Sequence, residues 1–214
     1  MELGLINPYV MKIVIAARQK DSISSISQRI GLSYGWAHKW ISALIKEGVF
    51  KEQWRGLIIE KDSSTYKKII SFLRKNFSQD INFYYEVLSL FGIKYCFTKT
   101  DSVFIWTEGG YNIARYKNYY PIFIKIRKSD YKKFLFYCKK LGLRINAKKG
   151  VFYSPEIVKD FNCTIKENNP TDTLEKTIQF MRKYRYNFQP ALEMISEMYN
   201  KELKIKYKEI ITNA

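Results

Sequence analysis

The stretch 21–60 constrains the fold more than any other, because two helical patterns within it are separated only by a short turn. We expect a first helix over residues 22–30, with Asp21 as its N-cap and isoleucines at helical spacing. Gly31 and Leu32 then end this helix, since glycine tolerates the left-handed backbone that a tight turn requires. The sequence therefore predicts two short helices joined by a tight turn.

The second helix of this pair is expected over residues 34–47, with Ser33 as its N-cap and Gly48 just beyond its end. Its apolar side chains fall on one stripe, formed by Ala37, Trp40, Ile41, Leu44 and Ile45. The opposite face then carries small, aromatic and cationic side chains, as on a helix that contacts a partner.

A β-hairpin is expected directly after the second helix, from strand-like runs over residues 49–54 and 57–60. A two-residue turn, Arg55-Gly56, joins the runs and puts a cation at the tip. The major groove of DNA is wide enough to admit one helix whose polar face carries donors near its N-terminus. The pattern therefore indicates binding of double-stranded DNA.

The same stretch resembles the winged helix-turn-helix family of prokaryotic transcription regulators. The resemblance rests on Leu32-Ser33-Tyr34-Gly35 and on Leu44-Ile45-Lys46-Glu47-Gly48-Val49, and it covers roughly the first quarter to third of the chain. It implies a DNA-binding domain over residues 1–62. We expect the DNA contacts at Ser33, Tyr34, Gly35, Trp36, His38, Lys39, Ser42 and Arg55. Winged helices also serve as protein-contact modules, and this alternative stays open.

A linker helix is expected over residues 63–79, between the first domain and the rest of the chain. Its apolar side chains lie at helical spacing, namely Tyr66, Ile69, Ile70, Leu73 and Phe77. This helix either bridges two domains or pairs with a second copy of the chain, and we expect a homodimer.

The second domain is expected over residues 80–214, with an α+β fold. Its patterns predict, in chain order, a helix over 83–91, a strand over 93–98, a short helix over 101–107, a strand over 121–126, a helix capped by Ser129 and running to Leu141, a hairpin of 143–145 and 151–153, a helix opened by an Asp172/Glu175 capping box and running to about residue 186, and a last helix opened by Pro190.

This order of elements resembles the minimal nucleotidyltransferase fold, especially its catalytically degenerate version in abortive-infection (type IV) antitoxins. Active members place a Gly-Ser pair before an Asp-x-Asp on the next strand, because two carboxylates must hold Mg²⁺. The strand over 121–126 carries no carboxylate, Gly109-Gly110 lacks the serine, and Asp101 and Asp130 are expected to be helix caps. We therefore expect no enzyme activity, no metal and no cofactor.

Positive charge is the other feature of the second domain. The chain carries a formal net charge of +17, and residues 115–149 hold twelve basic residues against one acidic residue. Such a stretch with interleaved tyrosines suits a phosphate backbone. We expect a second nucleic-acid patch at Arg115, Lys117, Arg127, Lys128, Lys132, Lys133, Lys139, Lys140, Lys148 and Lys149. The partner is flanking DNA, RNA or an acidic, toxin-like protein, and a merely solvated surface is the alternative.

Taken together, the patterns favour a sequence-specific DNA-binding transcription regulator, of which an antitoxin-type repressor is one form, with a basic, non-catalytic second domain. The alternatives are a nucleotidyltransferase-type enzyme acting on RNA or protein, and a protein-interaction adaptor. We expect a cytoplasmic protein with no membrane partner, because no apolar run approaches a membrane span and the 3 cysteines form no Cys-x-x-Cys.

Overall fold

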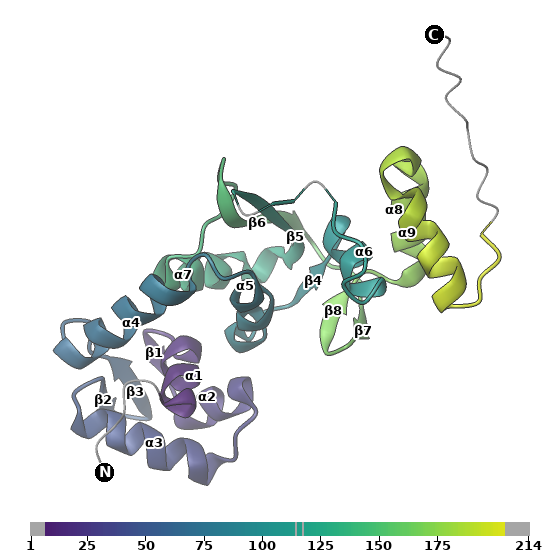
Figure 1. The fold of residues 1–214 in the computed structure, drawn as a ribbon. Coiled ribbons are helices and arrows are strands. Elements are labelled where there is room, and N and C mark those ends of the chain that lie inside the picture. The colour runs from purple at the N-terminus through teal and green to yellow at the C-terminus, as the bar shows by residue number, and fades with distance from the viewer. Residues whose placement is uncertain (1–6, 114, 117, 204–214) are drawn as a thin grey trace, which may run out of the picture.

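The structure is a computed structural model that describes residues 7–113, 115–116 and 118–203. Over these residues the chain combines helices with two separate sheets, so the expected α+β class is confirmed (Figure 1). The small sheet belongs to the N-terminal elements, and helix α4 (Ser64–Phe77) leads from them toward the large sheet. Helices α8 (Leu174–Lys183) and α9 (Arg185–Met198) lie at the end of the molecule farthest from the N-terminal elements (Figure 1).

The N-terminal elements, residues 8–59, are called the N-terminal unit below. They are α1 (Pro8–Ala16), β1 (Lys20–Asp21), α2 (Ile23–Ile30), α3 (Tyr34–Lys46), β2 (Phe50–Gln53) and β3 (Gly56–Ile59). The three strands form an antiparallel sheet in the order β1-β3-β2. The two helices and the hairpin predicted from the sequence are confirmed, whereas β1 was missed because two residues show no alternation.

Two details of the N-terminal unit correct the sequence predictions. The N-cap of α2 is Ser22, whose side chain accepts a hydrogen bond from the Ser25 N–H at 3.1 Å. Asp21 instead contacts the guanidinium of Arg29. The hairpin turn lies one residue earlier than predicted, at Trp54 and Arg55, because Gly56 already pairs with a residue of β2.

Helix α4 connects the N-terminal unit to helix α7 (Tyr131–Leu141) and packs against it (Figure 1). The apolar face of α4 is buried within the chain, at Tyr66, Ile69, Ile70 and Leu73. The Arg74 guanidinium donates to the carbonyls of Lys139 and Lys140, each at 3.0 Å. Within this chain α4 therefore bridges the N-terminal unit and α7, while pairing with a second copy of the chain stays a prediction.

The large sheet has five strands in the order β6-β5-β4-β8-β7. Its central strand β4 pairs antiparallel with β5 and parallel with β8, while β5 pairs parallel with β6. The strands are β4 (Tyr95–Phe97), β5 (Tyr119–Arg127), β6 (Gly150–Val158), β7 (Thr164–Lys166) and β8 (Asn169–Thr171). The remaining elements of this part of the chain are helices α5 (Ile81–Val87) and α6 (Thr100–Trp106) and the short 3-10 helices η1 (Leu88–Phe91) and η2 (Lys128–Asp130).

Several predictions of strand pairing and helix starts in this half of the chain are wrong. The run 143–145 forms no hairpin with 151–153, since β6 lies parallel to β5 and Ile145 makes only one parallel bridge to Tyr153. Helix α8 is capped by Thr173 in place of the Asp172/Glu175 box, because the Asp172 carboxylate is taken by Lys125. Pro190 lies inside α9, which begins at Arg185.

One hydrophobic core runs without a break from the N-terminal unit through α4 and α7 to the large sheet. The Tyr137 hydroxyl on α7 donates to the Ala16 carbonyl at the end of α1, at 2.7 Å. A second, smaller core joins α6 to α8 and α9 around Val103, Met181 and Ile195. The N-terminal unit is therefore fixed to the sheet by buried contacts and not only by the linker.

Candidate nucleic-acid interface

The first half of α3 forms an exposed face of the N-terminal unit. Figure 1 shows α3 on the side of the unit that faces away from the large sheet. Ser33 caps this helix as predicted, accepting from the Trp36 N–H at 3.4 Å. Tyr34 and Trp36 are 56% and 49% exposed. Of the other predicted contact residues on α3, Gly35, His38 and Lys39 are exposed and Ser42 is half-buried.

Aromatic stacking fixes the orientation of Trp36. The ring of Tyr9, on α1, stacks on Trp36 and on Trp40, with 5.8 Å between centroids in each pair. The Lys39 ammonium lies 4.9 Å from the centroid of Trp36, within range of a cation–π contact. Tyr9 was not predicted from the sequence, because its role depends on how α1 crosses α3.

The hairpin tip carries the most exposed large aromatic among the described residues, Trp54, at 89%. The Arg55 guanidinium lies 5.7 Å from the centroid of the Trp54 ring, and Arg55 has a left-handed backbone with φ 62°. A shallow hollow of about 290 Å³ is lined both by Tyr34, at the start of α3, and by Arg55. The helix start and the hairpin tip therefore border the same surface.

A left-handed glycine forms the turn between α2 and α3, and an ion pair fixes α2 to β1. Gly31 has a left-handed backbone with φ 66°, and a Cβ atom added there would meet no other atom within 4 Å. The left-handed backbone is therefore the reason that this position favours glycine. On the opposite side of α2, the buried pair of Arg29 and Asp21 connects α2 to β1. Arg29 also donates to the Ala16 carbonyl of α1 at 3.2 Å. These contacts connect α2, which packs against α3, to α1 and β1.

The ten residues predicted as a second nucleic-acid patch do not share one environment. Arg115 and Lys140 have buried side chains, and Lys117 lies outside the described residues. Arg127 and Lys133 both contact the Asp130 carboxylate, at 2.8 and 3.0 Å. The other five are exposed, namely Lys128, Lys132, Lys139, Lys148 and Lys149. Arg115 and Lys140 are therefore unavailable to a phosphate in this structure, which corrects the prediction for these two residues.

Arg115 is part of a buried polar cluster around Asp101, which lies inside the first turn of α6. The two side chains are 1% and 0% exposed, with 2.7 Å between Arg115 Nη1 and Asp101 Oδ1. The same carboxylate accepts from the Tyr85 hydroxyl and from the Phe123 N–H of β5. Burial raises the pKa of Asp101, while Arg115 and these hydrogen bonds lower it. Asp101 is therefore not the helix cap that was predicted.

Asp130 and Asp172 are likewise committed to cations. Asp130 makes no side-chain cap to α7 and accepts from the Lys94 N–H at 3.1 Å. Burial raises its pKa, but hydrogen bonds from Lys133, Lys94 and Arg127 outweigh that effect and lower it. Asp172 contacts Lys125 at 2.7 Å. Within the described ranges, no group of three or more His, Cys, Asp or Glu side chains is placed to hold a metal ion.

None of the helices in the described part of the chain is both long and apolar enough to cross a membrane. No protein family model matches the chain, and neither a curated protein nor a solved structure does.

Proposed function

We propose that the N-terminal unit is a winged helix-turn-helix and that the protein is a sequence-specific, double-stranded-DNA-binding transcription regulator. The observation that carries the proposal is the exposed surface shared by the start of α3 and the tip of the β2–β3 hairpin. In this arrangement α3 enters the major groove, and the hairpin acts as a wing on the neighbouring backbone or minor groove.

The side chains on this surface suit the two tasks that DNA recognition requires. His38 and Lys39 are exposed on α3 and offer donors for base edges, while Arg55 offers a cation to phosphate at the wing. Tyr34 and Trp36 supply apolar contact area of the kind that thymine methyl groups and sugars accept. In this proposal the rest of the chain serves as a non-catalytic body, and its buried carboxylates among the described residues, Asp101, Asp130 and Asp172, are held in ion pairs.

The recognition role of α3 is tested by the double variant His38→Ala/Lys39→Ala. Each lost base-edge contact is expected to weaken binding to a selected site by about 1–3 kcal/mol, with a smaller loss on random duplex. The site is first obtained by selection from a random library, and affinities are then measured by fluorescence anisotropy. Lys46→Ala, at the far end of the same helix, is the matched control and leaves both affinities unchanged. Equal losses on selected and random DNA contradict sequence reading by α3.

The wing role is tested by Arg55→Ala. A phosphate or minor-groove contact predicts a similar loss on every duplex sequence, and a salt dependence whose log–log slope falls by about 1. Lys51→Ala, an exposed lysine on β2 away from the tip, is the control for a change of net charge. A change in the preferred sequence, with the salt slope unaltered, contradicts this role for the wing.

A further inference from the structure

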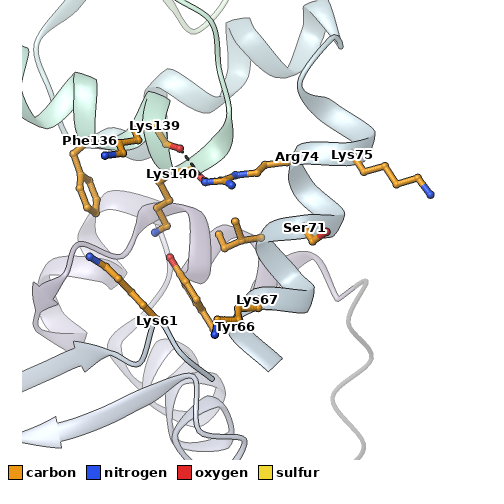
Figure 2. A pocket seen from close by; sticks show the side chains of 10 residues that line it. Lys61, Tyr66, Lys67, Ser71, Arg74, Lys75, Phe136, Lys139 and Lys140 are labelled. Carbon is orange, nitrogen blue, oxygen red and sulfur yellow. Dashed lines mark hydrogen bonds between the residues drawn. The ribbon is translucent and has the colours of Figure 1, made fainter. Parts of the chain in front are cut away.

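A large cavity lies between α4, α7 and the end of the N-terminal unit, away from the surface proposed to bind DNA. Its volume is about 770 Å³, which is within the range of about 300–1,000 Å³ typical of small-molecule sites. Figure 2 shows the Tyr66 hydroxyl directed toward the Lys140 amine, and the Lys61 side chain extending toward the Phe136 ring, which descends from α7. The cavity is thus enclosed by three separate parts of the chain.

Positive charge surrounds this cavity, and among its lining cations only Lys67 has a carboxylate partner within the described residues, Asp62. Six of its lining residues are lysine or arginine, and none of the described lining residues is acidic. Arg74 and Lys140 are already committed to backbone carbonyls. Lys61 and Lys139 are exposed and have no ion pair within the described residues, so they are free to bind an anion. Like charges gathered in one hollow attract an anionic ligand and raise its local concentration.

The floor of the cavity is apolar and aromatic. Ile70 and Tyr66 are 7% and 8% exposed, and Phe136 is half-buried with one side turned to the cavity. An aromatic ring of a ligand can stack on Phe136 or Tyr66 while its acidic group meets the lysines at the rim. The combination fits neither a simple inorganic ion nor a purely apolar ligand.

We propose that this cavity binds a small amphipathic anion of the nucleotide class, with an aromatic ring on the Tyr66–Phe136 floor and a phosphate among Lys61 and Lys139. A nucleic-acid backbone is a poorer fit, because a continuous chain follows an extended groove whereas this site is a single hollow of about 770 Å³. The site is separate from the α3 surface, so this inference does not rest on the proposed DNA-binding function.

The location of the cavity gives a bound ligand access to the N-terminal unit. Lys61 follows the last strand of the wing, and Lys140 donates to the Ile15 and Ala17 carbonyls at the end of α1. A ligand in this cavity lies beside the segment that follows β3 and beside the lysine that donates to the end of α1.

The test measures binding of AMP to the full-length protein by isothermal titration calorimetry, in the absence of DNA. Adenosine and inorganic phosphate are titrated separately at the same ionic strength. AMP is expected to bind more tightly than either part by about tenfold or more, because ring and phosphate are held together in one site. Lys61→Glu/Lys139→Glu is expected to weaken AMP binding by at least about tenfold.

Two further variants separate the site from general electrostatics. Lys68→Glu/Lys132→Glu makes the same charge change on α4 and α7 at exposed residues outside the cavity, and AMP affinity is expected to stay within about twofold. Ser71→Trp fills the cavity, keeps every cation and is expected to abolish binding. Thermal unfolding confirms that each variant folds. Phosphate binding as tightly as AMP, equal losses in the two lysine pairs, or no AMP binding at about 1 mM overturns the proposal.

Discussion

Replacing Asp101 by alanine is expected to lower the free energy of unfolding by about 3–5 kcal/mol, because it leaves the Arg115 guanidinium charged and buried without its partner. The Tyr85 hydroxyl and the Phe123 N–H lose their acceptor as well. These donors come from α5 and β5, so one carboxylate holds together three segments that are far apart in the sequence. Urea unfolding monitored by circular dichroism measures the change.

The matched control for Asp101 is an exposed ion pair. Asp62 and Lys67 are 3.3 Å apart with both side chains largely exposed, and Asp62→Ala is expected to cost at most about 1 kcal/mol. The double variant Asp101→Leu/Arg115→Met removes both buried charges and is expected to regain much of the stability lost in the single variant. Two outcomes contradict a buried and coupled pair. In the first, Asp101→Ala is no less stable than Asp62→Ala. In the second, the loss of stability in the double variant equals the sum of the losses in the two single variants.

Local chemistry explains why the N-terminal unit could be predicted closely. Each decisive signal there lies within a few residues of its effect, as when Ser33 caps α3 or Gly31 supplies the left-handed residue at the end of α2. The exposed residues of α3 follow from the same helical period, because the residues opposite an apolar stripe must face outward. The contact of Tyr9 with Trp36 depends on tertiary packing and left no such signal.

The pairing of strands in the second half of the chain could not be read in the same way. Strand β6 pairs with β5 across the whole of α7, and parallel strands need such a crossover, whereas the sequence signal for a hairpin acts only between neighbours. Strand β1 is two residues long and exists because β3 lies beside it. In both cases the partner, and not the strand itself, determines the structure.

The run of basic residues over 115–149 was a poor guide to which side chains are available to a partner. A run of lysines and arginines shows that a partner is anionic only if the side chains reach solvent, and Arg115 and Lys140 do not. A signal for Lys140 did exist, because it lies three residues after the buried Tyr137 and borders the apolar face of α7. Arg115 left none, since its partner Asp101 is recognisable only once α6 is placed.

The second large effect that we expect is a pH-dependent change in the free energy of unfolding when Lys140 is replaced. Its ammonium, on α7, donates to the carbonyls of Val14, Ile15 and Ala17 at the C-terminal end of α1. These are carbonyls that a helix end leaves without partners, and a cation is also favoured there by the helix dipole. The side chain of Lys140, on α7, therefore supplies hydrogen-bond donors to the C-terminal end of α1.

Burial lowers the pKa of Lys140 from 10.5 to about 7, with Asp21 opposing the shift and Arg29 adding to it. Between these two values the folded protein binds fewer protons at this site than the unfolded chain does. The free energy of unfolding therefore rises with pH through that window. It gains about 1.5 kcal/mol from this residue between pH 7 and about pH 8.5.

The variant Lys140→Met removes the donor and the titration together. It is expected to be less stable than the parent by about 3 kcal/mol near pH 8.5, because the two hydrogen bonds that the neutral amine can still donate to the α1 carbonyls are lost without compensation. Near pH 7 the difference is expected to be smaller by about 1.5 kcal/mol, since the parent then carries the cost of a partly charged, buried amine. Urea unfolding of both proteins at several pH values between these limits gives the two curves.

Lys139→Met is the control, because Lys139 is the exposed neighbour on the same helix. It keeps the Arg74 contact, which uses the Lys139 backbone carbonyl, and it is expected to follow the parent curve at every pH. Other groups with shifted pKa values, such as Cys138, are present in all three proteins and cancel in the comparison. A difference between Lys140→Met and the parent that is independent of pH shows that the amine stays fully charged in the fold. Equal stability at pH 8.5 shows that α1 does not depend on this lysine.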